Sequence, residues 1–193
     1  MKLVVFQGNT GLKYRDTRHN VGFMTANFYI KTLGLRWKND KKFGAEVTRL
    51  DDDVIFAKPQ LYYNLTGQVV QKVMSFYKID IDDLLVVCDD LNVDFGQVRV
   101  RASGSAGGNN GLKSIIDQIG DEFKRIRIGT HNDDTRNKSS DSAFVLSKFS
   151  RAEQKLLPNV FETTINFIES FMADNFAHET IDSLKPPVKS KNH

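Results

Sequence analysis

Contiguous apolar segments alternate along this chain with longer segments in which apolar residues recur every three or four positions. Contiguous apolar residues of β-branched and aromatic type predict buried strands, and residues 2–6 and 84–88 show this pattern most clearly. Recurrence every three or four positions predicts helices with one apolar face. The predicted helices span residues 21–33, 65–77, 112–119 and 151–176.

Further strands are expected at residues 43–50, 53–58, 98–100 and 123–128. Regular alternation of strands and helices is typical of an α/β fold. The 43–50 and 53–58 strands form a hairpin that an otherwise parallel sheet can carry at one side. We therefore expect a single domain over residues 1–182, with a mixed, largely parallel twisted sheet flanked by helices. A flexible C-terminal tail is expected at residues 183–193, and an interruption or entry of the last helix near Pro158.

Composition narrows the class of protein. With 193 residues the chain is long enough for one good core and short for two. It has no apolar stretch near the length that spans a bilayer, and the run after Lys2 is too short for a signal peptide. We expect a cytoplasmic protein without a membrane partner. The one cysteine, Cys88, has no partner for a disulfide or a zinc site, so we predict buried packing for it and no metal.

The net charge of +3 is unevenly distributed along the chain. Residues 95–151 carry 10 basic and 6 acidic side chains, and they include a glycine-rich segment at 104–111. The basic residues around that segment are Arg99, Arg101, Lys113, Lys124, Arg125 and Arg127. A phosphate-bearing ligand would favour such a cluster. A solvated charged face explains it equally well, because alternate strand residues share a face without sharing a partner.

Polar side chains follow three of the predicted strands at the point where each strand ends. Asn9 follows the first strand, Asn64 follows the 53–58 strand, and Asp89 follows the 84–88 strand. His19 lies near the start of the first helix. Open α/β sheets present functional groups at the carboxyl ends of their strands, although asparagine and aspartate are also common turn formers. Together these residues predict a cleft.

The glycine-rich segment 104–111 opens the helix at 112 and could bring backbone N–H groups close to an anion or a carbonyl oxygen. A flexible connector is the alternative interpretation. The segment lacks the glycine order of a dinucleotide-binding loop, and the chain contains no P-loop motif. NAD and ATP therefore lose support, and we expect no cofactor.

A series of motifs resembles the bacterial-type peptidyl-tRNA hydrolase family, in the same sequence order, along roughly the first 150 residues. These motifs are Gly8-Asn9-Thr10-Gly11, Tyr14, Thr17-Arg18-His19-Asn20-Val21-Gly22-Phe23, Tyr63-Asn64-Leu65-Thr66-Gly67, Asp89-Asp90-Leu91, Gly104-Ser105-Ala106-Gly107-Gly108, Asn110-Gly111-Leu112-Lys113 and Arg125-Ile126-Arg127-Ile128-Gly129. Chance agreement at so many points is implausible.

The resemblance implies hydrolysis of the ester between a peptide and the terminal ribose of tRNA. His19 would act as the general base that takes a proton from water, because a histidine side chain ordinarily titrates close to neutral pH. Asp89 would accept the other ring N–H and orient the imidazole. Asn9, Asn64 and Asn110 would recognise the peptide backbone and ribose, and one of these amides or a backbone N–H would stabilise the oxyanion.

The resemblance also implies contacts with tRNA. Tyr14 and Tyr62 match family positions associated with tRNA, where an aromatic face can stack on a base. Lys113, Arg125 and Arg127 would hold backbone phosphates, with Arg99 or Arg101 as further candidates, whereas inward-pointing members of this group would be structural. The implied partner is the acceptor end of peptidyl-tRNA, bound by a monomer.

The chain departs from the family pattern at several positions. The family usually has proline where Thr10 stands, phenylalanine and methionine where Tyr62 and Tyr63 stand, Asp-Leu-Pro at 92–94, and often histidine where Asn109 stands. None of these positions is the expected base. We expect Asn109 to alter substrate positioning or pH dependence and Tyr63 to narrow the peptide channel, while activity is retained.

Two other functions stay open at this point. An RNA-binding homologue could keep the tRNA surface without hydrolysis, but intact His19 and Asp89 count against it. An esterase for another acylated small molecule is less consistent with the basic segment at 95–151.

Overall fold

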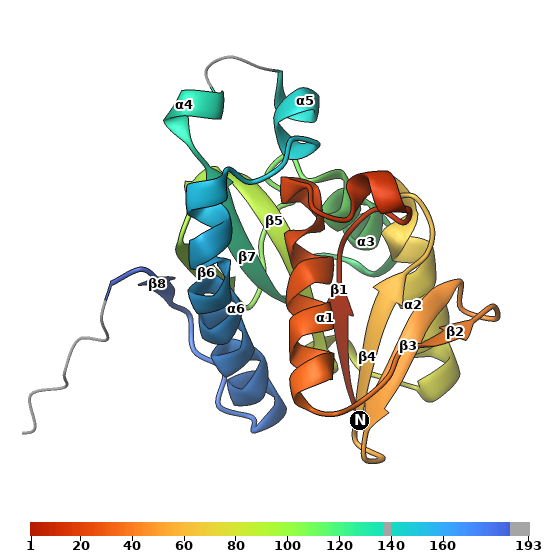
Figure 1. The fold of residues 1–193 in the computed structure, drawn as a ribbon. Coiled ribbons are helices and arrows are strands. Elements are labelled where there is room, and N and C mark those ends of the chain that lie inside the picture. Colours follow the sequence, from red (N-terminus) through yellow and green to blue (C-terminus); the bar gives the residue numbers. More distant parts are fainter. Residues whose placement is uncertain (137–139, 186–193) are drawn as a thin grey trace, which may run out of the picture.

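One sheet of eight strands forms the centre of the computed structural model, which describes residues 1–136 and 140–185 (Figure 1). The strands are β1 (Lys2–Phe6), β2 (Lys38–Asp40), β3 (Ala45–Leu50), β4 (Val54–Pro59), β5 (Leu84–Asp94), β6 (Gln97–Arg101), β7 (Lys124–His131) and β8 (Thr180–Asp182). Their spatial order is β2-β3-β4-β1-β5-β7-β6-β8. Strands distant in sequence are therefore neighbours at the centre of the sheet.

The sheet is parallel at its centre and antiparallel at both edges. The pairs β4–β1, β1–β5 and β5–β7 are parallel, whereas the outer pairs on either side are antiparallel. The mixed sheet expected from the sequence is confirmed, including the antiparallel hairpin of β3 and β4. Because the central strands run the same way, their carboxyl ends meet at one edge of the sheet.

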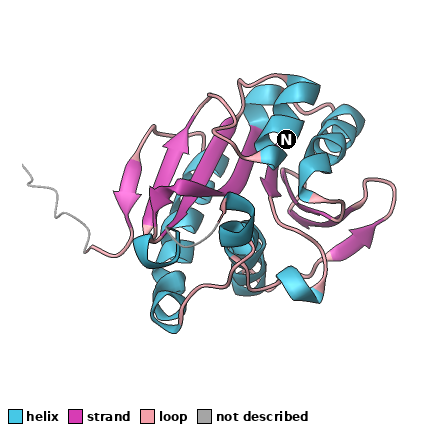
Figure 2. Cartoon of the chain, turned by 90° about the horizontal axis from the view of Figure 1, so that it is seen from above, coloured by secondary structure: helices cyan, strands magenta, loops and turns pink. Residues whose placement is uncertain are grey.

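Helices cover both faces of the sheet, as Figure 2 shows from above. The α-helices are α1 (Val21–Thr32), α2 (Thr66–Tyr77), α3 (Asn110–Ile119), α4 (Asp133–Arg136), α5 (Asp141–Val145) and α6 (Arg151–Met172). Four short 3₁₀ turns within the described residues are η1 (Leu12–Tyr14), η2 (Arg18–Asn20), η3 (Tyr63–Leu65) and η4 (Ile81–Asp83). Helices α1 and α6 pack on one face, and α2 and α3 pack on the other.

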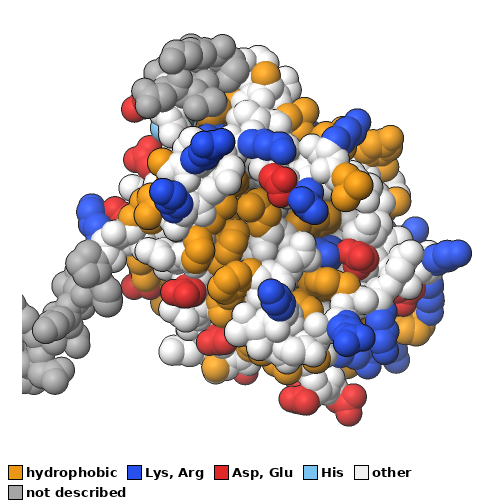
Figure 3. Space-filling view, in the orientation of Figure 1, with side chains coloured by type: hydrophobic (Ala, Val, Ile, Leu, Met, Phe, Trp, Pro, Cys, Tyr) orange, Lys and Arg blue, Asp and Glu red, His pale blue; other side chains and the backbone are white. Residues whose placement is uncertain are grey.

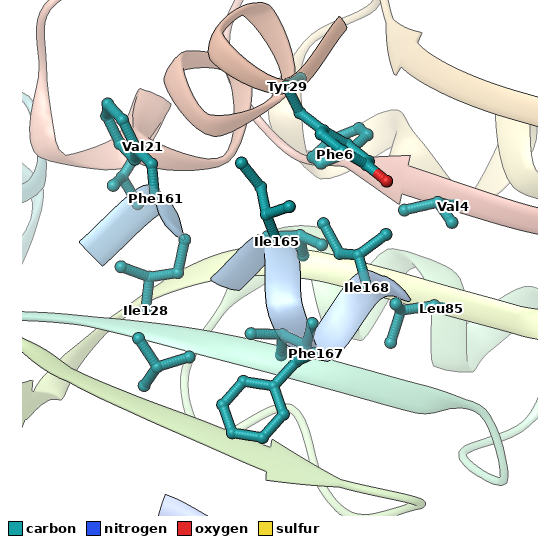
Figure 4. Packing of buried hydrophobic residues seen from close by; sticks show 14 of the residues in the cluster. Val4, Phe6, Val21, Tyr29, Leu85, Ile128, Phe161, Ile165, Phe167 and Ile168 are labelled. Carbon is teal, nitrogen blue, oxygen red and sulfur yellow. The ribbon is translucent and has the colours of Figure 1, made fainter. Parts of the chain in front are cut away.

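The alternation of side chains in β1 shows why this strand is apolar throughout. Val4 and Phe6 point to the face covered by α1 and α6, and Leu3 and Val5 point to the opposite face. All four are almost completely buried. Figure 4 shows Val4 and Phe6 packed near Ile168 of α6. Burial of each such side chain contributes roughly 1.5 to 3 kcal/mol, so a central strand needs apolar residues on both faces.

Helix α6 continues through Pro158 without a break, so the predicted interruption there is wrong. Pro158 and Gln154, whose carbonyl loses its helical partner, are both exposed to solvent, where water can satisfy that carbonyl. The helix begins with a capping box, in which Ser150 Oγ accepts from the Glu153 N–H and Glu153 Oε2 accepts from the Ser150 N–H.

Two glycines permit close approaches that shape the sheet and its helical cover. A Cβ at Gly67 would overlap the backbone carbonyl of Ser114, where α2 crosses α3. A Cβ at Gly129 would overlap the Asp94 carbonyl, where β5 bulges out of register with β7. Strand β5 therefore runs well past the predicted end at residue 88 and carries polar residues beyond the apolar core.

Cys88 is fully buried, as predicted. Of the predicted tail, residues 186–193 lie outside the described residues. Ser183, directly after β8, donates its backbone N–H to the Gly96 carbonyl at 2.8 Å. No helix in the described ranges is both long enough and apolar enough to cross a bilayer.

Candidate active site

A cavity of about 520 Å³ opens at the carboxyl ends of β1 and β5. Helix α5, which lies above this edge of the sheet in Figure 1, contributes Asp141 and Val145 to its wall. The other polar residues that line the cavity are Asn9, His19, Asp89, Asp90, Asn92, Asn109, Asn110, Arg127 and Ser142. The cavity therefore combines one imidazole and one guanidinium with carboxylates and carboxamides.

His19 and Asp89 are in direct contact in this cavity. His19 Nδ1 lies 2.9 Å from Asp89 Oδ2, so the structure brings together two residues that are 70 positions apart in sequence. The Asp89 side chain is 3% exposed and that of His19 is 14% exposed. Because Nδ1 faces the carboxylate, Nε2 is the ring nitrogen that remains for a ligand. The pair has the arrangement of an oriented general base.

Tyr63 lies under His19 and bonds to the same aspartate. The two rings are stacked, with centroids 3.6 Å apart and planes inclined by 18°. Tyr63 Oη donates to Asp89 Oδ1 at 2.7 Å. Burial, and secondarily the charge of Asp89, raises the pKa of Tyr63 well above its usual value, so the hydroxyl keeps its proton. Tyr63 is 4% exposed and does not line the cavity, so the expectation that it narrows a channel is wrong.

Asn109 uses the two ends of its amide for different partners. Its Oδ1 accepts from the backbone N–H groups of Gly111 and Leu112, which makes it the N-cap of α3. Its Nδ2 lies 2.9 Å from Tyr63 Oη and 3.2 Å from the Asp89 carbonyl oxygen. Asn109, which was expected to alter substrate positioning, thus contacts both Asp89 and Tyr63, the tyrosine that donates to the Asp89 carboxylate.

Asn9 is held from both sides at the end of β1. Its backbone N–H and C=O pair with the side chain of Asn20 at 2.8 and 2.9 Å. Its side-chain Oδ1 accepts from the Tyr63 N–H at 3.2 Å. The Asn9 amide nitrogen is therefore the end left for a ligand in the cavity.

The other two predicted amides lie in different environments. Asn110, the first residue of α3, is exposed and lines the cavity. Asn64 lies on η3 with an exposed side chain and is not among the residues that line the cavity. The expected trio of carboxamides in one groove is therefore reduced to Asn9 and Asn110, joined by Asn92 and Asn109.

The two tyrosines expected to contact tRNA lie on short turns next to the site. Tyr62, which directly precedes η3, is 71% exposed. Tyr14 at the end of η1 is half-buried, and Lys13 Nζ lies 4.7 Å above the centre of its ring. An aromatic face with a nearby cation suits a nucleic-acid base and its phosphate.

The predicted phosphate contact is wrong for Arg125, which is fully buried. Its guanidinium is surrounded by backbone carbonyls and donates to those of Gly104, Asp121 and Phe123, so no face is left for a phosphate. Burial also lowers the pKa of Arg125 to about 10. Arg125 thus anchors the glycine-rich segment, which is the structural role considered for inward-pointing residues.

Arg127 and Lys113 differ in their access to solvent. Arg127 Nη1 forms an ion pair with Asp90 at 3.1 Å, and Nη2 donates to the Ser105 carbonyl at 2.6 Å, so both nitrogens already have partners. Lys113 is exposed on α3 and forms a surface pair with Asp117. Of Lys113, Arg125 and Arg127, Lys113 is the one whose charge faces solvent.

Arg18, which precedes His19, has a structural role that its sequence context did not predict. The Arg18 guanidinium donates to both carboxylate oxygens of Glu153 at 2.8 Å and lies between the rings of Phe144 and Phe149. Its backbone N–H donates to the Ser147 carbonyl. This arrangement fixes the turn that carries His19 against the segment that contains α5 and the start of α6.

Glu153 keeps its negative charge in this buried pair. Burial by itself would raise the pKa of Glu153, but hydrogen bonds from Arg18 and from the Ser150 N–H outweigh burial and lower it below its usual value. Among the described residues, no three His, Cys, Asp or Glu side chains are grouped as a metal ion would require.

Comparisons with known proteins agree over nearly the whole chain. The sequence profile of the peptidyl-tRNA hydrolase family matches residues 3–191. A peptidyl-tRNA hydrolase from Pelodictyon phaeoclathratiforme is 40% identical over 189 residues, which cover 96% of this chain and 99% of that protein. One from Staphylococcus epidermidis is 38% identical over 192 residues, covering 98% and 100%. The crystal structure of peptidyl-tRNA hydrolase from Acinetobacter baumannii gives a TM-score of 0.73 at 30% identity, covering 93% of this chain and 96% of that one.

Proposed function

Because the chain belongs to the peptidyl-tRNA hydrolase family and has its activity, we propose that His19 is the general base of the reaction and that Asp89 orients it. The observation that carries this proposal is the 2.9 Å contact between His19 Nδ1 and Asp89 Oδ2. It supports the tautomer in which Nδ1 carries the proton and Nε2 is free to accept one. The carboxylate then favours the imidazolium that forms during the reaction.

The reaction proceeds by attack of water on the ester carbonyl. His19 Nε2 takes a proton from water while the water oxygen bonds to the carbonyl carbon, which gives a tetrahedral oxyanion. The bond between that carbon and the ribose oxygen then breaks, and the imidazolium returns its proton to the ribose oxygen. The products are a free peptide carboxyl and tRNA with its terminal hydroxyl restored.

We assign oxyanion stabilisation to the Asn9 amide nitrogen, because the Tyr63 N–H already occupies Asn9 Oδ1. Removing a donor of this kind typically costs about 3 kcal/mol of transition-state stabilisation. Asn110 faces the same cavity and is assigned to the peptide backbone or the ribose. Asn64, which is exposed on η3, is assigned to the tRNA side of the substrate.

The tRNA is expected to approach across the exposed turns beside the cavity. Tyr62 and Tyr14 offer aromatic faces for the terminal bases, and Lys113 offers a charge for a phosphate. Figure 3 shows Lys and Arg side chains gathered over the N-terminal part of α6 and the turns before α1. Exposed basic residues in and next to these segments include Lys13, Arg15, Lys148, Arg151 and Lys155. We expect the protein to act in the cytoplasm as a monomer.

The decisive experiment measures release of N-acetylaminoacyl groups from tRNA. Wild type should hydrolyse this substrate and spare aminoacyl-tRNA with a free amino group. His19→Ala should lose roughly a hundredfold or more of kcat, because proton transfer by a placed base contributes about that much. His178→Ala, which changes an exposed histidine near the end of the described chain, is the matched control and should retain full activity. Equal inactivity of wild type and His19→Ala, with tRNA binding retained, would favour an RNA-binding protein instead.

A further inference from the structure

We propose that Tyr63 and Asn109 are positioning residues that act as a coupled pair on Asp89. They hold its carboxylate so that Oδ2 meets His19 while Oδ1 is shared between two donors. This inference rests on the proposed role of His19 as the base. It adds two side chains that act through Asp89, one of which does not line the cavity at all.

The three side chains form a closed set of contacts, because each of them bonds to the other two. Asp89 Oδ1 lies 2.7 Å from Tyr63 Oη and 3.3 Å from Asn109 Nδ2, and these two donors lie 2.9 Å from each other. The Tyr63 hydroxyl accepts a hydrogen bond from Asn109 Nδ2 and donates its own O–H to the carboxylate of Asp89. Donation from Asn109 therefore strengthens donation from Tyr63.

Each donor is fixed by contacts of its own. Asn109 cannot turn its amide over, because its Oδ1 caps the first N–H groups of α3. The Tyr63 ring is held between His19 on one side and Gly111 on another, where a Cβ would come within 2.5 Å of Tyr63 Cε1. Both donors to Asp89 Oδ1 are thus fixed in place. A rotation of the carboxylate away from His19 would break its hydrogen bonds with Tyr63 and Asn109.

Both positions are among those at which the chain departs from the family pattern. Methionine, which the family usually has at position 63, carries no hydroxyl to give to Asp89. The departure at Asn109 contacts the departure at Tyr63, and both contact the same carboxylate. We infer that this chain positions Asp89 with hydrogen bonds from Tyr63 and Asn109, which the usual family residues at these two positions do not provide in the same form.

The hydrogen bonds from Tyr63 and Asn109 also affect how the negative charge of Asp89 is distributed over its two oxygens. Hydrogen bonds to Oδ1 draw negative charge away from Oδ2 and so weaken the stabilisation of a protonated His19. The other charged groups around the cavity are already paired: Asp90 with Arg127, and Asp141 with Arg136. Loss of the Tyr63 hydroxyl should therefore favour the imidazolium, so that the neutral base forms only at higher pH.

The first test removes the hydroxyl and keeps the ring. Tyr63→Phe should lower kcat roughly 3- to 10-fold with little change in KM, because one hydrogen bond to a charged group is lost. The acid limb of its pH–rate profile should move to higher pH. Tyr29→Phe is the matched control, since Tyr29 is also buried and its hydroxyl also contacts a carboxylate, that of Glu169, away from the cavity. It should leave the pH profile unchanged.

The second test measures coupling. Asn109→Ser keeps a side-chain oxygen for the cap of α3 but removes the Nδ2 donor. If the residues act as a pair, Tyr63→Phe combined with Asn109→Ser should lose clearly less activity than the product of the two single losses. Thermal unfolding of each variant separates loss of folded protein from loss of turnover.

Two outcomes would overturn the inference. The first is a Tyr63→Phe enzyme with the kcat and pH profile of wild type. The second is a double variant whose losses multiply, which would show two independent effects. Both tests are made after wild type is shown to be active and His19→Ala is shown to be impaired. Failure of this inference is therefore distinct from failure of the proposed general base.

Discussion

The imidazole of His19 lies flat on the ring of Tyr63, with ring centroids 3.6 Å apart. One face of the histidine is therefore covered by an aromatic ring, and its Nδ1 edge is covered by Asp89. We therefore expect the ring to keep its place when one of the two contacts is weakened. Position and charge at this histidine can thus be separated by mutation.

Asp89→Asn should lower kcat by roughly a hundredfold or more with little change in KM. The asparagine has the same size, and stacking on Tyr63 holds the imidazole, but the negative charge that stabilises the imidazolium is gone. Single-turnover hydrolysis of N-acetylaminoacyl-tRNA measures the effect. Asp52→Asn, in the exposed turn between β3 and β4, serves as the control and should behave as wild type. An Asp89→Asn enzyme of normal turnover would remove the carboxylate from the mechanism.

Glu153→Gln should destabilise the fold by about 3 kcal/mol, because Arg18 would remain buried without a counter-charge. Urea unfolding measures this loss. Glu162→Gln, at an exposed position of the same helix, is the control and should change stability by less than about 0.5 kcal/mol. If Glu153→Gln leaves the free energy of unfolding unchanged, the aromatic rings and the backbone carbonyl around Arg18 are enough to stabilise its buried charge.

The same glutamate predicts a pH dependence of stability. The pKa of Glu153 is lower in the folded protein than its ordinary value of 4.5. Its contribution is therefore fully present above pH 4.5 and is lost as the pH falls through the folded value. Between neutral pH and acid, wild type should lose more unfolding free energy than Glu153→Gln. Parallel slopes for the two proteins over this range would contradict the prediction.

Gly67→Ala should destabilise the protein even though alanine is intrinsically the better helix former by about 1 kcal/mol. The added Cβ would overlap the Ser114 carbonyl and force α2 away from α3. Gln68→Ala, at the exposed neighbouring position, has no such clash and should be neutral or slightly stabilising. Thermal unfolding distinguishes the two, and a Gly67→Ala protein with raised Tm would show that the helices can part freely.

Tyr62→Ala should raise KM for the tRNA substrate roughly tenfold with kcat nearly unchanged, since stacking on a base contributes about 1 to 3 kcal/mol. Phe76→Ala provides a matched control, because Phe76 is also exposed and aromatic but lies next to Phe43, outside the catalytic cavity. Its KM should match that of wild type. Equal effects of both substitutions would indicate loss of folded protein rather than loss of a tRNA contact.

Most of the sheet was predictable because its central strands are buried on both faces and therefore apolar throughout. The edge strands were not predictable in this way. Strand β2 consists of Lys38–Asp40, and β8 is largely exposed, so each is defined by the strand that it pairs with and not by an apolar pattern. Helix α5 spans five residues, which is too short to show a helical period.

The contact between His19 and Asp89 was predictable from motif order, whereas the surroundings of this pair were not. Whether Arg125 faced solvent or the interior depended on the packing of the glycine-rich segment, which strand alternation does not reveal. The role of Tyr63 depended on Asp89, and that of Arg18 on Glu153, partners 26 and 135 positions away. Such pairs are set by topology, because local sequence carries no information on which distant strand or helix will arrive beside them.

The position of Glu153 near the start of the last long helix has a consequence for how this protein is made. Every residue assigned here to catalysis leaves the ribosome before residue 153 does. Until Glu153 emerges, Arg18 has no carboxylate partner. The turn η2, which contains both Arg18 and His19, then lacks its contact with the last helix. The enzyme therefore completes its own catalytic centre only late in translation.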